Sequence, residues 1–195
     1  MHDIEPYYKW RDAYVASDDE RSPFFGQVYD EFRFTNRVYN YFIHPQWDEM
    51  GSDTLYLKVI YADYDLAYAI VELIGEWNDC LGNDIMYFKR KVVDYMIDEG
   101  ITKFIVICEN VFNFHGSDDC YYEEWYEDIA DEGGWICFLN TFDHVADEMR
   151  STQIQHYVNF GPRFNDINWR PRKPRGLLHM VEELMLSEKR RYLNG

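Results

Sequence analysis

The chain has 195 residues, of which 47% are hydrophobic and 18% aromatic, so it has the apolar side chains for a core, and disorder caused by low hydrophobicity is excluded. Its formal net charge of −17 at pH 7 repels a phosphate backbone and argues against nucleic-acid binding by the main body. No run approaches the ~18 to 20 apolar residues that span a bilayer, and the start lacks a basic segment followed by an apolar one, so neither membrane insertion nor secretion is expected.

The cysteine pattern predicts reduced thiols in the cytoplasm. Cys80, Cys108, Cys120 and Cys137 form no Cys-x-x-Cys pair, and Cys108 and Cys137 lie inside apolar runs typical of strands. This pattern favours neither a disulfide framework nor a zinc site. We therefore expect no metal and no cofactor held by these residues.

The first third of the chain predicts an extension followed by strands. Residues 1–37 are rich in aromatics, and their spacing up to about Pro23 indicates a short helix. The runs 38–43, 55–62 and 69–77 are rich in β-branched and aromatic residues and are bounded by turn signals, so each predicts a strand. The last two are expected to form an antiparallel hairpin, although a helix over 69–77 is the alternative that the pattern leaves open.

Helices and strands alternate in the middle of the chain. Asn83-Asp84 is expected to cap a helix that ends at Gly100, and the uninterrupted apolar run 104–108 predicts a central strand covered on both faces. Residues Ser117 to Asp119 are expected to cap a second helix that runs to Gly133, and 135–139 predicts another buried strand.

The pattern closes with a third helix over 145–149, capped by Thr141 or Asp143, and a strand or strand-like segment over 154–160. Together these elements predict an α/β domain over residues 38–161, with a mostly parallel central sheet faced by helices and an antiparallel hairpin at its N-terminal end.

Residues 162–195 read as a basic linker followed by an amphipathic helix. Residues 163–195 contain eight Lys or Arg against four acids, whereas the rest of the chain is strongly acidic. The apolar face of the helix is expected to dock on the body or on a partner, because its side chains are costly to leave in water. These side chains are Leu177, Leu178, Val181, Leu184 and Met185.

Six polar residues after the central strand form the best candidate site, because open α/β sheets bind ligands beyond the carboxyl ends of their strands. These residues are Glu109, Asn110, His115, Ser117, Asp118 and Asp119. The competing interpretation is that Asp118 and Asp119 are charges at a helix N-terminus and that His115 is a solvated loop residue.

Catalytic signatures are missing from the sequence. A nucleophile would need Ser117 or Cys120 within reach of His115, yet no Gly-x-Ser-x-Gly motif surrounds them. Asp63 and Asp65 lack the spacing of a calcium loop, and the sequence has no glycine-rich phosphate loop.

Residues 69–160 resemble the STAS family, known from sulfate transporters and anti-sigma-factor antagonists. The resemblance rests on Ile70 to Glu76, on the run 104–108 and on the segment 111–117, which falls where antagonists carry a loop ending in Asp-Ser-Ser-Gly. It implies that Ser117 lies near the phosphorylatable serine of that family. Gly116 and Asp118 depart from the motif, so phosphoregulation is not carried over. The sequence also resembles uncharacterised bacterial proteins that share the runs 75–78 and 109–115.

Two functions follow as hypotheses. The first is a non-enzymatic interaction or regulatory module that binds a protein partner through the loop 109–120, with a homo-oligomer left open. The second is a small-molecule binder or enzyme that uses Glu109, His115, Ser117 and Asp119. Convergence of these side chains in an enclosed pocket would favour the second hypothesis.

Overall fold

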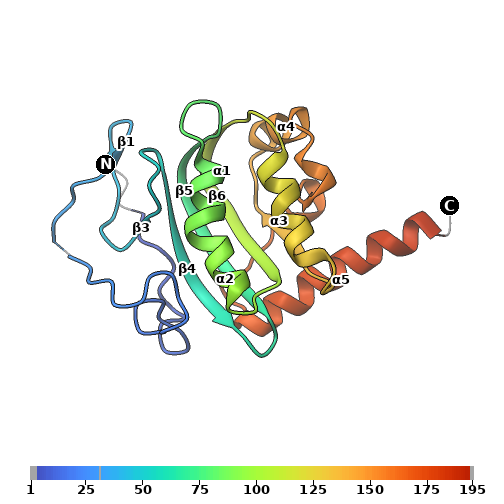
Figure 1. The fold of residues 1–195 in the computed structure, drawn as a ribbon, viewed down its shortest axis with the longest axis horizontal. Helices are drawn as coiled ribbons and strands as arrows, with labels where there is room; N and C mark the ends of the chain where they lie inside the picture. The colour runs from blue at the N-terminus through green and yellow to red at the C-terminus, as the bar shows by residue number, and fades with distance from the viewer. Residues whose placement is uncertain (1–3, 31, 194–195) are drawn as a thin grey trace.

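The computed structural model describes residues 4–30 and 32–193, with side chains as far as Ser187 (Figure 1). Among these residues, six strands form one mixed sheet in the order β3-β4-β5-β6-β7-β8. The strands are β3 (Asp48–Glu49), β4 (Leu55–Asp63), β5 (Tyr68–Asn78), β6 (Lys103–His115), β7 (Trp135–Leu139) and β8 (Val158–Asn159). β3, β4 and β5 are antiparallel neighbours, and β5 to β8 run parallel, which confirms the predicted fold class.

The predicted hairpin is formed by β4 and β5, with Leu57 opposite Leu73. The alternative of a helix over 69–77 is therefore wrong. Near the end of β5, Gly75 has a φ of +123°, and a Cβ at this position would lie 2.0 Å from the carbonyl oxygen of Thr54. This close approach requires glycine, because any side chain would collide with the backbone.

Three helical segments cover one face of the sheet (Figure 1). The first runs continuously through α1 (Asp84–Phe88), the π-helical η1 (Lys89–Val93) and α2 (Asp94–Asp98), which confirms the helix predicted to end at Gly100. The others are α3 (Cys120–Ala130) and α4 (Asp143–Ser151). The opposite face is covered by α5 (Pro174–Leu193), together with the N-terminal segment.

The π-helical turn buries a lysine between helices. The Nζ atom of Lys89, whose side chain is 0% exposed, donates to Asp94 and lies 2.6 Å from Oδ2 of Asp128 on α3. Burial opposes the charge of Lys89, but the hydrogen bonds to Asp128 and Asp94 outweigh this effect and raise its pKa. Arg90 next to it pairs with Glu124 on α3 at the surface. These ion pairs fasten the first helical segment to α3.

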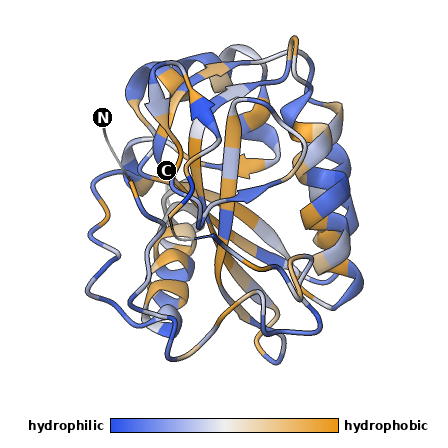
Figure 2. Ribbon diagram, turned by 90° about the vertical axis from the view of Figure 1, so that its left-hand side faces the viewer, coloured by the Kyte–Doolittle hydropathy of each residue, from blue (hydrophilic) through white to orange (hydrophobic). Residues whose placement is uncertain are grey.

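Each face of the sheet has its own core. Beneath α1 to α4, the buried side chains include Trp77, Phe88, Phe104, Val106 and Trp125. Beneath α5, Ile105 and Ile107 of β6 are buried against the side chains of Trp10, Trp169, Leu177, Leu178 and Val181. Apolar residues accordingly concentrate along the strands in Figure 2, with polar residues outside. The predictions of a doubly covered strand at 104–108 and of a docked C-terminal helix are confirmed.

Several local predictions are wrong. Residues 4–30 form turns and extended segments without a helix. The expected strand over 38–43 is a small hairpin of β1 (Arg37–Val38) and β2 (Tyr41–Phe42), because Tyr39 turns the chain with a φ of 54°. The expected strand over 154–160 is a 3-10 turn, η2 (Ile154–His156), followed by the two residues of β8.

The helix caps and the tail also differ from expectation. Phe142 occupies the N-cap of α4 in place of Thr141 or Asp143. A further 3-10 turn, η3 (Pro162–Phe164), lies in the expected linker, and α5 begins at Pro174. The side chains of Lys189, Arg190 and Arg191, three of the basic residues of the tail, lie outside the described residues. No helix in the described part of the chain is long and apolar enough to cross a membrane.

Candidate interaction surface

The predicted loop 109–120 is mostly strand. β6 continues to His115, so Glu109, Asn110 and His115 lie on the sheet, and only residues 116–119 connect it to α3. Asp119 is the N-cap residue of α3, but its side chain makes no capping hydrogen bond. Asp118 accepts a hydrogen bond of 3.2 Å from the backbone of Cys120, and Ser117 is exposed.

Bulges in β6 decide where these side chains lie. The register against β5 pairs Glu72 with Ile107 but Ile74 with Asn110, so β6 has one extra residue between the pairs. The register shifts a second time one residue later. Gly75 pairs with Val111 and Glu76 pairs with Asn113, so Phe112 is the extra residue. Each extra residue redirects the side chains that follow it, so the simple alternation of a strand fails after Cys108.

Glu109 belongs to a cluster on the face covered by α5. Its carboxylate accepts hydrogen bonds from Arg170, from Nε1 of Trp169 at 3.2 Å and from the amide of Asn140 at 3.4 Å. The guanidinium of Arg170 also lies over the ring of Trp169, 4.7 Å from its centroid. Glu109 is therefore engaged in holding the 169–170 segment against the sheet.

A second carboxylate lies buried beside this cluster. Glu72 on β5 is 1% exposed, accepts a hydrogen bond of 2.8 Å from the backbone of Tyr7, and lies 3.9 Å from Arg170. Burial raises the pKa of Glu72 to about 7, and the nearby Glu109 acts in the same direction. This carboxylate connects the N-terminal segment to the sheet, and sequence reasoning missed it because it stands in an otherwise apolar strand.

His115 belongs to a different cluster at the carboxyl end of the parallel strands. Its Nε2 atom lies 2.9 Å from Oε1 of Glu76 and 3.0 Å from Nδ2 of Asn113. The hydroxyl of Tyr39 reaches the same Glu76 and Asn113 from the β1–β2 hairpin. Six residues of extended chain, about 20 Å, separate His115 from Glu109, so the predicted residues do not converge on one site.

The backbone around His115 is fixed by the loop that follows β5. The amides of Asp79 and Cys80 donate to the carbonyl oxygen of His115 at 2.9 and 3.1 Å. The thiol of Cys80 lies 2.6 Å from the carbonyl oxygen of Gly116. The next residue, Leu81, is 90% exposed, so the loop presents an apolar side chain directly beside this cluster.

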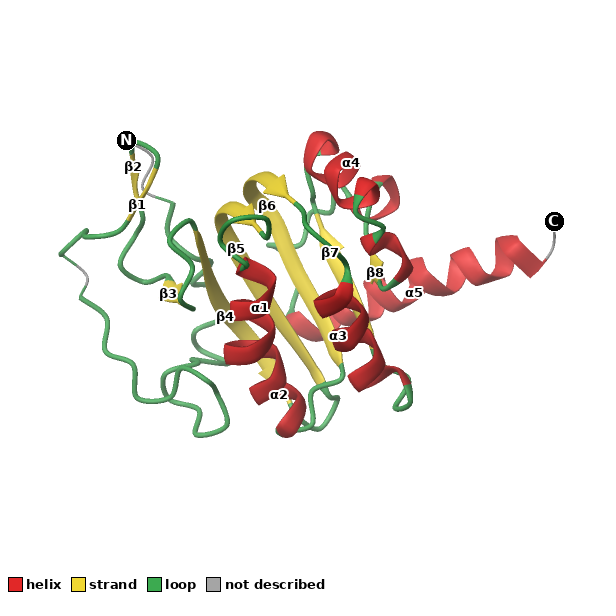
Figure 3. Cartoon of the chain, turned by 45° about the horizontal axis from the view of Figure 1, so that its top comes forward, coloured by secondary structure: helices red, strands yellow, loops and turns green. Residues whose placement is uncertain are grey.

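Aromatic side chains continue the same surface toward the start of α4. Figure 3 shows α4 at the same end of the sheet as the loop between β5 and α1. His144 donates a hydrogen bond of 2.8 Å to the carbonyl oxygen of Phe112, and the ring of Phe142 stacks on that of His144. Tyr39, Phe112 and Phe142 are 61%, 38% and 43% exposed. We call the whole the carboxyl-edge surface. It consists of Tyr39, Glu76, Leu81, Phe112, Asn113, His115, Phe142 and His144.

The carboxyl-edge surface is apolar with acidic flanks. It includes Glu76, is flanked by Asp118 and Asp143, and has no Lys or Arg among its eight residues. Of these eight residues, sequence reasoning identified only His115. The exposure of Phe112 could have been predicted from the spacing of its neighbours. Cys108, Val111 and Phe114 are three residues apart and all face the core beneath α1 to α4, which indicates bulges between them.

The thiol of Cys120, at the start of α3, is not activated. A hydrogen bond to Asp118, followed by burial, raises the pKa of Cys120 to about 11, so it is a neutral thiol near pH 7. Burial also raises the pKa of Cys108. All four cysteines are free, with Cys108 and Cys137 buried and Cys80 and Cys120 exposed. Within the described residues, no group of three or more His, Cys, Asp or Glu side chains is arranged to hold a metal ion.

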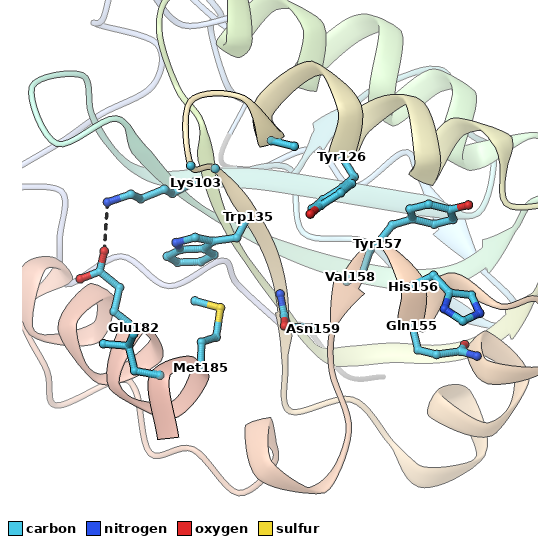
Figure 4. Close-up of a pocket in the computed structure, with 14 residues that line it drawn as sticks. Lys103, Tyr126, Trp135, Gln155, His156, Tyr157, Val158, Asn159, Glu182 and Met185 are labelled. Carbon is cyan, nitrogen blue, oxygen red and sulfur yellow. Dashed lines mark hydrogen bonds and ion pairs between the residues drawn. The ribbon is translucent and has the colours of Figure 1, made fainter. Parts of the chain in front are cut away.

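A cavity of about 570 Å³ lies elsewhere, between α3, β8 and α5 (Figure 4). Its walls carry the aromatic rings of Tyr126, Trp135 and Tyr157. None of the six predicted residues lines it. This cavity is therefore not the pocket of converging predicted residues that the small-molecule hypothesis requires.

The sequence matches no family model and no curated protein. Among solved structures, the chain is similar to the anti-sigma factor antagonist SpoIIAA in its unphosphorylated form, with a TM-score of 0.44 and 11% identity over 54% of this chain and 88% of that one. It is also similar to the Bacillus cell fate determinant SpoIIAA in the phosphorylated form, with a TM-score of 0.39 and 10% identity over 54% and 91%. Both similarities cover about half of this chain and concern the overall fold alone.

Proposed function

We propose that this chain is a non-enzymatic protein-interaction module that binds a basic segment of a partner protein through the carboxyl-edge surface. The observation that carries the proposal is the exposure of apolar side chains on a fixed backbone, with Leu81 at 90% and Tyr39 at 61%. Exposed apolar side chains gathered at one place are typical of protein-binding surfaces. A regulatory role would follow from control of this contact.

The chemistry of the partner follows from charge. Glu76, Asp118 and Asp143 flank the apolar side chains, and the whole chain carries −17. Such a surface attracts Lys and Arg and repels acids, so charge selects the partner while the apolar side chains supply most of the binding energy. A segment with one or two large apolar residues between basic ones fits best.

Site-specific photo-crosslinking in the native cell tests this proposal. A photoreactive residue replaces Leu81 in one variant and Val28 in another. These positions are 90% and 89% exposed, and they lie in the loop after β5 and in the N-terminal segment. We expect a protein adduct from position 81 that is weak or missing from position 28, with the crosslinked peptide rich in Lys and Arg. Equal adducts at both positions, or an acidic crosslinked peptide, would overturn the proposal.

A second pair of variants separates binding from folding. Phe142→Ser, placed in the chain that carries the probe at position 81, is expected to abolish the adduct without lowering the melting temperature, because this side chain is 43% exposed. The matched control is Phe25→Ser, because Phe25 is 56% exposed in the N-terminal segment. Loss of the adduct in the control as well would contradict a specific surface.

A further inference from the structure

The cavity between α3, β8 and α5 is a groove with an aromatic floor (Figure 4). Tyr126 and Tyr157 approach with their ring centroids 6.3 Å apart, and Trp135 lies beside them. Lys103 and Glu182 border the groove and pair with each other at 3.0 Å. The remaining wall is α5 itself, which contributes Met185 and Leu186.

The helix that forms this wall extends beyond the body. α5 has 20 residues and is therefore about 30 Å long. Among its described side chains, which end at Ser187, the buried ones are Leu177, Leu178 and Val181 in its first half. Leu186, at the edge of the groove, is 55% exposed. Figures 1 and 3 show the C-terminal half of α5 projecting away from the sheet and the other helices.

The surroundings of the groove are acidic, whereas the C-terminal end of α5 is basic in sequence. From Ser117 to Asn140 the sequence contains no Lys or Arg, and Glu127, Asp131 and Glu132 are exposed along and just after α3. Tyr157 in the groove has its pKa raised by partial desolvation and by the neighbouring Glu123. The last turns of α5 have the opposite character in sequence, since Lys189-Arg190-Arg191 is followed by Tyr192 and Leu193.

We propose that the groove receives the C-terminal end of α5 from a second copy of this chain. The basic residues 189–191 would lie beside the exposed acids of α3 at the rim of the groove, while apolar residues of the helix end would cover the aromatic rings of Tyr126, Trp135 and Tyr157. The groove cannot be filled by its own helix end, because α5 forms one wall and runs away from it. Each chain carries both halves of the contact, and the proposal is that two chains exchange their helix ends reciprocally, so that the contact occurs twice in a two-fold dimer.

The first test is the mass of the full chain in solution, measured by sedimentation equilibrium from low to high micromolar concentration. We expect twice the 23.6 kDa of the single chain at the upper end, with dissociation as salt is raised. A single-chain mass throughout would overturn the proposal and would leave the groove to another occupant.

Charge reversal then locates the contact. One variant carries Lys189→Glu, Arg190→Glu and Arg191→Glu, and the other carries Glu127→Lys and Asp131→Lys. Each alone places like charges at both contacts and is expected to have the single-chain mass. An equimolar mixture pairs each reversed end with a reversed wall, so we expect the dimer to return.

This mixing experiment separates a loss of contact from a loss of folding. Recovery of the dimer requires that both variants are folded and that the helix end faces α3. A mixture that keeps the single-chain mass, or a single variant that remains dimeric, would contradict the proposed contact. Both variants keep Glu124 and Asp128, so the ion pairs with Arg90 and Lys89 remain in place.

Discussion

The hydroxyl of Tyr122 on α3 donates a hydrogen bond of 2.8 Å to the carboxylate of Asp79 at the end of β5. The same carboxylate accepts hydrogen bonds of 2.9 Å from Nε1 of Trp77 and from the backbone amide of Ile85 at the start of α1. Asp79 is 4% exposed and Tyr122 is 0% exposed. One buried carboxylate therefore joins the sheet to α1 and α3, directly below the carboxyl-edge surface.

We expect Asp79→Ala to lower the free energy of unfolding by about 3 kcal/mol, because it leaves the buried donors of Trp77, Tyr122 and Ile85 without an acceptor. Part of this loss is offset, because the substitution also removes the cost of burying a carboxylate. That cost is evident from burial, which raises the pKa of Asp79 to about 6. Urea denaturation measures the change. The matched control is Asp118→Ala, an exposed carboxylate, for which we expect a change within about 0.5 kcal/mol. Equal losses would contradict this role.

The pH dependence of stability should report Glu72. Its pKa rises from 4.5 to about 7 on folding, so between these values the folded protein binds the proton more tightly than the unfolded chain does. The stabilisation is fully present below about pH 4.5 and is lost as the pH rises through about 7, which corresponds to roughly 3 kcal/mol at most. Glu72→Gln should remove this decline and be the more stable form above pH 7. The free energy of unfolding is measured by urea denaturation at a series of pH values. The same pH dependence in both proteins would refute the assignment.

Lys89 and Arg90 give a comparison of a buried and an exposed ion pair in adjacent residues. We expect Lys89→Ala to lower the free energy of unfolding by about 3 kcal/mol. It removes a buried aliphatic side chain and the ion pair that links the π-helical turn to Asp128 of α3. Arg90→Ala should cost less than about 1 kcal/mol, since its pairs with Glu124 and Asp94 are exposed to solvent. Chemical denaturation distinguishes the two, and similar costs would show that Lys89 contributes only as surface charge.

Gly75→Ala should prevent stable folding. The added Cβ would meet the carbonyl oxygen of Thr54 at 2.0 Å, and this backbone clash comes in addition to the strain of a positive φ, so we expect a loss above about 4 kcal/mol. Gly100→Ala also has a positive φ, of +94°, but has nothing within 4 Å, so its cost should be about 1 kcal/mol. The yield of folded protein and the melting temperature test this difference.

The order of elements and the position of the central strand could be predicted from the sequence, because residues 104–108 and 135–139 are uninterrupted apolar runs. The end of β6 could not, because the side chains that face the first core change from two-residue to three-residue spacing at Cys108, Val111 and Phe114. Two bulges produce this spacing, and polar residues between them resemble a loop. The sequence therefore predicted Glu109 and His115 in one site. In the structure Glu109 lies on the face covered by α5, and His115 lies at the carboxyl end of the strands.

Other misses arose from contacts between distant residues. The aromatic residues Tyr7 and Trp10 indicated a helix by their spacing, but they pack on Trp169, with ring centroids 4.8 and 5.6 Å away. No local pattern shows a partner that lies more than 150 residues along the chain. The carboxyl-edge surface was missed for the same reason, since Tyr39, Leu81 and Phe142 come from separate loops.

One face of the sheet is covered by both the N-terminal segment and α5, so it can be buried only late in the synthesis of these residues. Ile105 and Ile107 emerge from the ribosome before the segment that buries them, which includes Trp169, Leu177 and Val181. At typical rates of synthesis, roughly 5 to 20 residues per second, this apolar face stays open for several seconds in every new molecule. During that interval the nascent chain exposes an apolar surface of the kind that chaperones bind, and this face can be covered only after Val181 has been synthesised.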